Sequence, residues 1–305
     1  MKNLINHRFG VEIELNSFDG LSKNDDLNGP LGIKHAAEII KNSLNESVDV
    51  APWHTTLNTS KWLTKPDSSC GFEVVSPILK GNTGLKSLKK VIKSLKKDGR
   101  FITDSRCSFH VHFELPSKDI DYISTLIVYW MKCELFFYLL IPNFRKQSRY
   151  CQLMGMSDVF PQNVTLDKNI IFNKISDYKF YSMSLYHFKK SKRNTVEFRI
   201  MDHSACLDSD VAECWLLLLN IFINKVGKFN AFDKDGNLKE KLVWYDCSEV
   251  FDFLQIKNNK KIVNFITKRI KKFNEPYFSL KLFKKIFNFY FDNTIKFLEF
   301  LKLDK

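Results

Sequence analysis

Apolar and polar side chains alternate with a period of two in three segments of the chain. These segments are residues 8–16, 107–115 and 194–202, and each places a row of apolar side chains on one face. Because successive side chains of a strand point to opposite faces, the alternation predicts β-strands with one apolar and one polar face. A shorter strand is expected at residues 72–76, directly before Pro77. Together these strands would form a sheet whose apolar face packs on helices.

Segments with helical periodicity lie between and after these strands. Helices are expected at residues 32–46, 83–98, 117–141 and 210–225. Residues 143–194 are polar and irregular, and from about residue 231 onward Phe and Lys recur at the spacing of amphipathic helices. The expected fold class is α+β, with a curved, mainly antiparallel β-sheet packed on helices and an all-helical C-terminal extension.

The polar faces of the three alternating strands carry pairs of ionisable side chains at positions i and i+2. The pairs are Glu12 and Glu14, His110 and His112, and Glu197 and Arg199. Each pair alone fits an ordinary solvated sheet face or a cross-strand ion pair. Like charges on one strand repel unless a counter-charge compensates them, and a divalent cation is the simplest one. Carboxylates with imidazoles suit Mg²⁺ or Mn²⁺, and a guanidinium in the same cleft favours a phosphate.

Four short motifs follow one another in the order of a known enzyme family. They are Phe-Gly-Val-Glu-Ile-Glu at 9–14, Phe-Glu-Val-Val-Ser-Pro at 72–77, Phe-His-Val-His-Phe at 109–113 and Thr-Val-Glu-Phe-Arg-Ile at 195–200. Over roughly residues 8–215 the chain resembles the amidoligase family, relatives of glutamine synthetase and glutamate–cysteine ligase. The resemblance implies a glutamine-synthetase-like catalytic domain over residues 1–228. Residues 229–305 would then form a basic helical C-terminal extension that packs on this domain.

The resemblance also implies an activity, an ATP-dependent carboxylate–amine ligase that forms an amide bond through an acyl-phosphate intermediate. Divalent cations, Mg²⁺ or Mn²⁺, would lie between the strands with the phosphates of ATP bridging them. One ion would be held by Glu12, His110 and Glu197, and another by Glu14 and Glu73. His112 and Arg199 would contact ATP phosphates, and the expected catalytic residues are Arg199, His112 and Glu73. The substrates would be a carboxylate and an amine, each a small molecule or part of a peptide or protein.

Three further residues enter through the same resemblance. Asp67 stands in a segment similar to the family's Asp-Gly-Ser and would bind the substrate amine or a metal, or else cap a turn. Arg145 and Arg149 lie in a segment that is Arg-rich in the family. They would hold a substrate carboxylate or the γ-phosphate of ATP, or else serve a structural role at the surface.

The formal net charge of +13 favours acidic partners. Much of the excess lies at the C-terminal end, where residues 257–305 carry 13 Lys or Arg against 4 Asp or Glu. This end would be either a solvated basic surface or a contact for nucleic acid or another polyanion. The charge therefore does not support the catalytic interpretation of the strands.

Cysteine usage and hydropathy indicate the cellular compartment in which the protein is expected. The 7 Cys residues are odd in number and include no Cys-x-x-Cys pair, which argues against a disulfide framework and a structural zinc site. Reduced thiols in a cytoplasmic protein fit best. The apolar segment 122–142 is interrupted at its centre by Lys132 and Glu134, so we expect a buried helix and no contact with a membrane.

Two other functions fit the same residues. The first is a metal-dependent hydrolase that uses the acidic face without ATP. The second is a nucleic-acid-binding protein that retains a degenerate ligase sheet, for which the basic C-terminal helices are the motivation. A purely structural module is disfavoured by the full set of motif residues.

Overall fold

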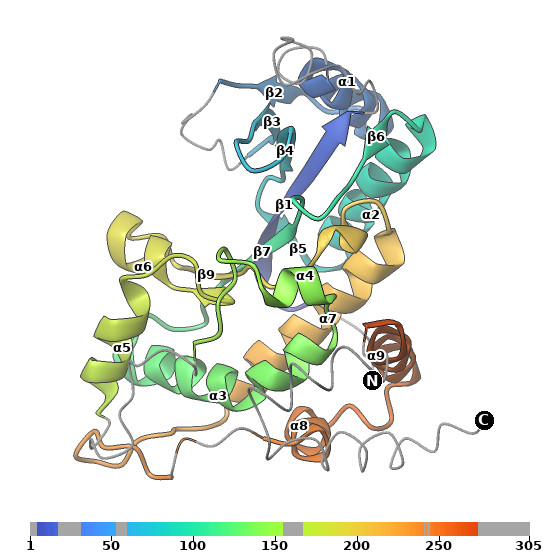
Figure 1. The fold of residues 1–305 in the computed structure, drawn as a ribbon. Helices are drawn as coiled ribbons and strands as arrows, with labels where there is room; N and C mark the ends of the chain where they lie inside the picture. Colours follow the sequence, from blue (N-terminus) through green and yellow to red (C-terminus); the bar gives the residue numbers. More distant parts are fainter. Residues whose placement is uncertain are drawn as a thin grey trace. The chain divides into compact units, whose positions relative to one another are not determined.

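The fold is described by a computed structural model that covers residues 5–17, 32–52, 60–154, 167–240, 242 and 245–273 of the chain (Figure 1). The described residues form two compact units. The sheet unit lies within Lys2–Leu115 and Thr195–Asn220, and the helical unit lies within Pro116–Asn194 and Ile221–Lys305. The boundary between a catalytic domain and an extension at residue 228 stays a prediction.

The sheet unit is built around β1 (Arg8–Ser17), which pairs with β4 (Phe72–Val75) on one side and β7 (Phe109–Glu114) on the other. The strand order β2–β3–β4–β1–β7–β9 is antiparallel except for the parallel β2–β3 pair. The remaining strands are β2 (Val48–Val50), β3 (Trp62–Pro66), β5 (Leu79–Lys80), β6 (Phe101–Ile102) and β9 (Thr195–Phe198). The predicted mainly antiparallel sheet is confirmed, and the four expected strands are β1, β4, β7 and β9.

The apolar rows of the strands form the core of the sheet unit. Ile13 lies opposite Val74 on β4 and Phe109 on β7, and all three are fully buried. Helix α1 (Gly32–Leu44) packs against β3, β4 and helix α2 (Gly81–Asp98). Helix α2 ends at Gly99, whose left-handed backbone (φ 78°) suits glycine. The helix end predicted at residue 98 is thus confirmed.

Helix α7 (Ser209–Val226) confirms the helix expected at residues 210–225, and the 3₁₀ helix η2 (His203–Ala205) precedes it. The helical unit contains α3 (Ile120–Leu139), α4 (Asn143–Lys146), α5 (Lys168–Ser176), β8 (Met183–Ser184), α6 (Tyr186–Ser191), α8 (Cys247–Leu254) and α9 (Lys260–Phe273). The expectation of an irregular segment 143–194 is therefore partly wrong. Short helices form there, and Asp167 caps the start of α5 by accepting hydrogen bonds from two backbone N–H groups.

The two charges inside the apolar helix α3 have partners. Lys132 forms an ion pair with Glu240, and Glu134 accepts hydrogen bonds from the backbone N–H of Met154 and from the hydroxyl of Ser182. Because both charged groups have partners, this helix can be buried in the protein. Among the residues that the structure describes, no helix has the length and apolar character needed to cross a membrane.

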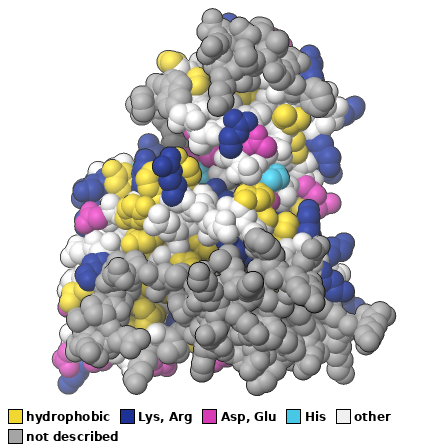
Figure 2. Space-filling model, in the orientation of Figure 1, with side chains coloured by type: hydrophobic (Ala, Val, Ile, Leu, Met, Phe, Trp, Pro, Cys, Tyr) yellow, Lys and Arg dark blue, Asp and Glu magenta, His cyan; other side chains and the backbone are white. Residues whose placement is uncertain are grey.

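The C-terminal part differs from the expected all-helical extension. Phe232 and Leu238 form a β-bridge, and the described helices after it are α8 and α9. Residues 274–305 of the predicted extension lie outside the described residues. On the face drawn in Figure 2, Lys and Arg side chains are spread over the described surface.

Candidate functional site

Polar side chains of three neighbouring strands meet on one face of the sheet unit. Glu12 of β1 lies opposite His110 of β7, and His112 of β7 lies opposite Glu197 of β9. Side chains that are directly opposite in an antiparallel pair share a face and lie about 5 Å apart at Cβ. The register therefore brings together side chains that are distant in the sequence.

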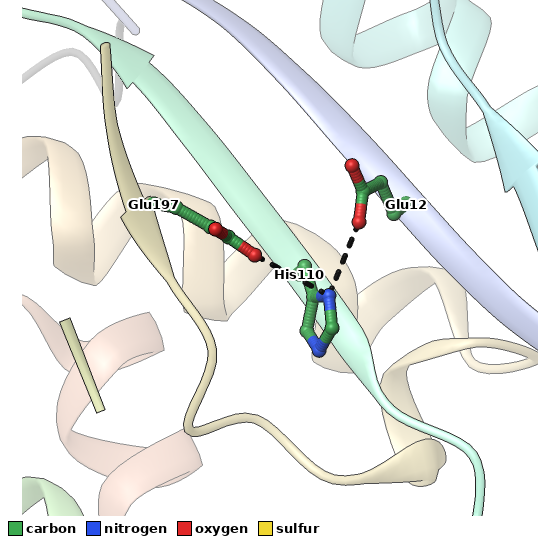
Figure 3. Close-up of side chains that lie close together, drawn as sticks. All are labelled: Glu12, His110 and Glu197. Atoms are coloured by element: carbon green, nitrogen blue, oxygen red, sulfur yellow. Dashed lines mark hydrogen bonds and ion pairs between the residues drawn. The ribbon is translucent and has the colours of Figure 1, made fainter. Parts of the chain in front are cut away.

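His110 lies at the centre of this group and is 4% exposed. Its Nδ1 is 3.2 Å from Oε2 of Glu12 and 3.6 Å from Oε1 of Glu197 (Figure 3). One ligand atom from each of the three residues lies within 4.8 Å of the other two. In the described part of the chain, it is the one group of at least three His, Cys, Asp or Glu side chains with this spacing. We call Glu12, His110 and Glu197 the central cluster.

Four other side chains contact the central cluster, one of them Glu14, whose Oε1 is 3.7 Å from His110 Nε2. His112 Nε2 is 3.1 Å from Oε1 of Glu12, and the guanidinium of Arg199 pairs with the carboxylate of Glu197. Ser108 Oγ lies 2.8 Å from His110 Nε2 and donates a hydrogen bond of 2.7 Å to Glu14. Ser108 is not among the site residues predicted from the sequence. Its signal was the same i, i+2 spacing, because Ser108 comes two residues before His110.

The ionisation of the cluster follows from its burial and its charges. Burial raises the pKa of Glu12, but the charge of His112 and the polar contacts with the His110 and His112 rings outweigh it and hold the pKa well below its usual value. Burial also raises the pKa of Glu197, but the charges of Arg199 and His112 outweigh burial and hold this pKa below its usual value. Both carboxylates are therefore ionised at neutral pH.

The two imidazoles differ in their titration. Burial, together with the charge of Arg199, lowers the pKa of His110, which favours the neutral ring. Burial also lowers the pKa of His112, but the charge of Glu12 and a hydrogen bond to it outweigh burial, so this pKa is raised. The neutral imidazole is the form that ligates metal ions, and the protonated form suits contact with an anion.

Glu14 and Glu73 lie beside the central cluster, opposite each other on β1 and β4. Glu73 forms an ion pair with Lys65 of β3, its neighbour in the register. Burial and the charge of Glu12 raise the pKa of Glu73 to about 8, although Lys65 opposes the shift. The assignment of Glu14 and Glu73 to a second ion stays a prediction.

Asp67, Arg145 and Arg149 complete the set of predicted site residues. Asp67 accepts hydrogen bonds from the backbone N–H groups of Ser69 and Cys70, which is the turn-capping geometry. Arg145 is buried in α4, and Arg149 donates a hydrogen bond to the hydroxyl of Tyr150. Both arginines belong to the helical unit, whereas the central cluster belongs to the sheet unit.

The donor set of the central cluster fits a hard divalent cation. Two ionised carboxylates and one imidazole nitrogen are ligands that Mg²⁺ and Mn²⁺ accept, whereas structural zinc sites favour thiolates. His110 Nδ1 faces oxygens of both Glu12 and Glu197, so either a proton or a cation must lie between these atoms. A cation at this place would be held by His110 Nδ1 and by oxygens of both carboxylates.

A comparison with curated proteins finds no match to the sequence. Among solved structures, a bifunctional glutathione synthetase from Pasteurella multocida is similar at 8% sequence identity and a TM-score of 0.38. The similarity covers 92% of this chain and 49% of that one, so this chain spans about half the length of the synthetase. A TM-score this low supports no inference about fold or activity.

A comparison with family models, in contrast, gives a match over most of the chain. The model of a family described as "Putative amidoligase enzyme" matches residues 6–219. This range contains all four motifs and every residue of the central cluster. Because the match spans more than half of the sequence, the chain belongs to this amidoligase family.

Proposed function

We propose that this protein is an ATP-dependent carboxylate–amine ligase with a divalent cation, Mg²⁺ or Mn²⁺, at the central cluster. The observation that carries the proposal is the geometry of that cluster in a member of an amidoligase family. Two carboxylates and an imidazole from three strands converge within 4.8 Å, and Arg199 lies directly beside them. A cation and a phosphate group are the ligands that this combination of charges suits.

The reaction explains why such a site is needed. A carboxylate is a poor electrophile, and ATP can activate it by transferring its γ-phosphoryl group to give an acyl phosphate and ADP. The amine then attacks the acyl carbon, and inorganic phosphate leaves. A bound cation would neutralise the phosphate oxygens of ATP.

The residues around the cluster would act on the same phosphates. Arg199 would stabilise charge on the phosphoryl group as it moves, because a guanidinium matches phosphate oxygens with two parallel N–H groups. His112, with its raised pKa, would donate a hydrogen bond to a neighbouring phosphate oxygen. Glu14 and Glu73 would hold a second ion, as the family resemblance implies. Arg145 and Arg149 remain candidates for a substrate carboxylate or the γ-phosphate.

The test measures ADP release in Mg²⁺ buffer with a panel of amino acids and short peptides, each offered as carboxylate donor, as amine, or as both. We expect ADP and phosphate, and not AMP, to form only when both partners are present. Glu14→Gln and Glu197→Gln should each reduce turnover about 100-fold or more. Near-normal turnover in both variants contradicts the proposal.

Glu114→Gln is the matched control. Glu114 follows His112 by two residues on β7, but it pairs with Arg8 and touches no member of the central cluster. Its substitution should leave turnover unchanged. Metal-dependent hydrolysis of peptides or esters without ATP would support the hydrolase alternative.

The basic C-terminal end motivates a separate proposal about partners. Helix α9 carries six Lys or Arg residues among its 14 positions. Binding of nucleic acid through these helices should weaken steeply with salt and should survive Glu12→Gln and Glu197→Gln. Binding that is insensitive to salt would exclude this contact.

A further inference from the structure

Ser108 is a buried hydroxyl that contacts two ionisable side chains of the candidate site. It is 2% exposed and precedes strand β7, so its side chain shares a face with that of His110. Its Oγ lies 2.7 Å from Oε2 of Glu14 and 2.8 Å from Nε2 of His110. Both distances are those of good hydrogen bonds.

These two hydrogen bonds constrain the proton on the His110 ring. A hydroxyl has one hydrogen to donate. The hydroxyl of Ser108 donates it to Oε2 of Glu14, and the oxygen of Ser108 is left to accept from His110. The ring nitrogen that donates to it is Nε2. In a neutral ring, Nδ1 then carries the lone pair.

A competing arrangement places the ring proton on Nδ1, on the opposite side of the ring from Ser108. If Nδ1 carried the proton, it would donate to Oε2 of Glu12 at 3.2 Å, and this hydrogen bond would occupy the space between the two carboxylates. The Nδ1–H form would thus be stable without a cation and would have to be undone before one could bind. The contact with Ser108 opposes this form.

We propose that Ser108 is a positioning residue that holds His110 as the Nε2–H tautomer and so directs the Nδ1 lone pair at the cation. The inference rests on the proposed function, because it concerns how the protein prepares the central cluster for its ion. Outer-shell partners of this kind orient an imidazole and fix its tautomer, and their loss typically weakens metal binding about 10- to 100-fold. We expect the same range here.

The first experiment titrates Mn²⁺ alone into the full-length protein and follows free Mn²⁺ by electron paramagnetic resonance. Ser108→Ala should weaken Mn²⁺ binding about 10- to 100-fold, whereas Ser108→Thr keeps the hydroxyl and should bind close to the wild type. Ser76→Ala is the matched control. The Ser76 hydroxyl is also buried in the sheet unit, but it bonds to the backbone of Val11 and Pro77 and not to the cluster.

The second measurement reads the tautomer directly through the ¹⁵N resonances of the His110 ring in metal-free protein. The wild type should show the Nε2–H form, and Ser108→Ala should shift the ring toward the Nδ1–H form. Data on the wild-type protein alone can contradict the inference. Poor folding of a variant therefore does not prevent a decision. An Nδ1–H ring in the wild type overturns it.

The outcomes separate this inference from the proposed function. If the wild type binds no Mn²⁺, the proposed function itself fails and the role of Ser108 fails with it. If the wild type binds Mn²⁺ and Ser108→Ala binds it equally well, only the role of Ser108 is refuted. If Ser76→Ala weakens binding as much as Ser108→Ala does, the effect is a general loss of sheet structure, and the inference is again refuted.

Discussion

Replacement of Glu12 by Gln tests whether the central cluster binds a cation without any knowledge of the substrates. Glu12 contributes one of the three ligand atoms, and its two oxygens also contact His110 and His112. Gln has almost the same shape but removes the charge. We expect the loss of a ligand charge to weaken binding at least as much as the 10- to 100-fold effect of an outer-shell change.

The size of the effect follows from the linkage between binding and folding. At a Mn²⁺ concentration 100 times the wild-type Kd, the ion stabilises the wild type against unfolding by about 2.7 kcal/mol. A 10- to 100-fold weaker site in Glu12→Gln leaves about 1.4 to 0.4 kcal/mol of that stabilisation at the same concentration. With about 2–4 °C of Tm per kcal/mol, the wild-type shift is roughly 5–10 °C and the shift of the variant is at most about half of it.

Differential scanning fluorimetry with and without Mn²⁺ measures both shifts. Each protein serves as its own reference, so a change in the stability of the metal-free variant does not affect the comparison. Glu114→Gln should retain the full shift, since Glu114 pairs with Arg8 outside the cluster. Equal Mn²⁺-induced shifts in the wild type and Glu12→Gln would refute the assignment of the central cluster.

Three further predictions concern the stability of the fold. Gly99→Ala should cost about 1–2 kcal/mol in urea unfolding, because Gly99 has a φ of 78° while nothing lies within 4 Å of the added Cβ; an unchanged midpoint would contradict this. Glu134→Ala should cost about 1–3 kcal/mol for each buried donor it leaves unsatisfied, the backbone N–H of Met154 among them, and a loss under 1 kcal/mol in the same assay would contradict it. Asp98→Asn should lower the Tm near pH 6 but barely at pH 2. Hydrogen bonds from Arg100 lower the pKa of Asp98 to about 2, so the stabilisation is present above pH 4 and is lost as the pH falls from about 4 to 2; equal effects at both pH values would contradict this.

The strands and their two faces could be predicted from local pattern because side-chain direction in a strand depends only on position along the chain. The alternation around Glu12, His110 and Glu197 identified β1, β7 and β9 and placed the polar groups on one face. The ends of α2 and α7 were equally local, since they depend on caps and on periodicity. The short helices α5 and α6 were missed because their helical periodicity covers too few turns.

The sequence by itself determined which side chains belong to the polar face, and the tertiary structure decided which of them touch. Glu12 and His110 are 98 positions apart, and only the pairing of β1 with β7 in one register makes them neighbours. A shift of that register by one residue would turn His110 to the opposite face. Ser108 is two positions from His110, but its contact with Glu14 likewise exists only because two strands lie side by side. Such contacts depend on distances between chain segments, and no pattern within a single segment contains them.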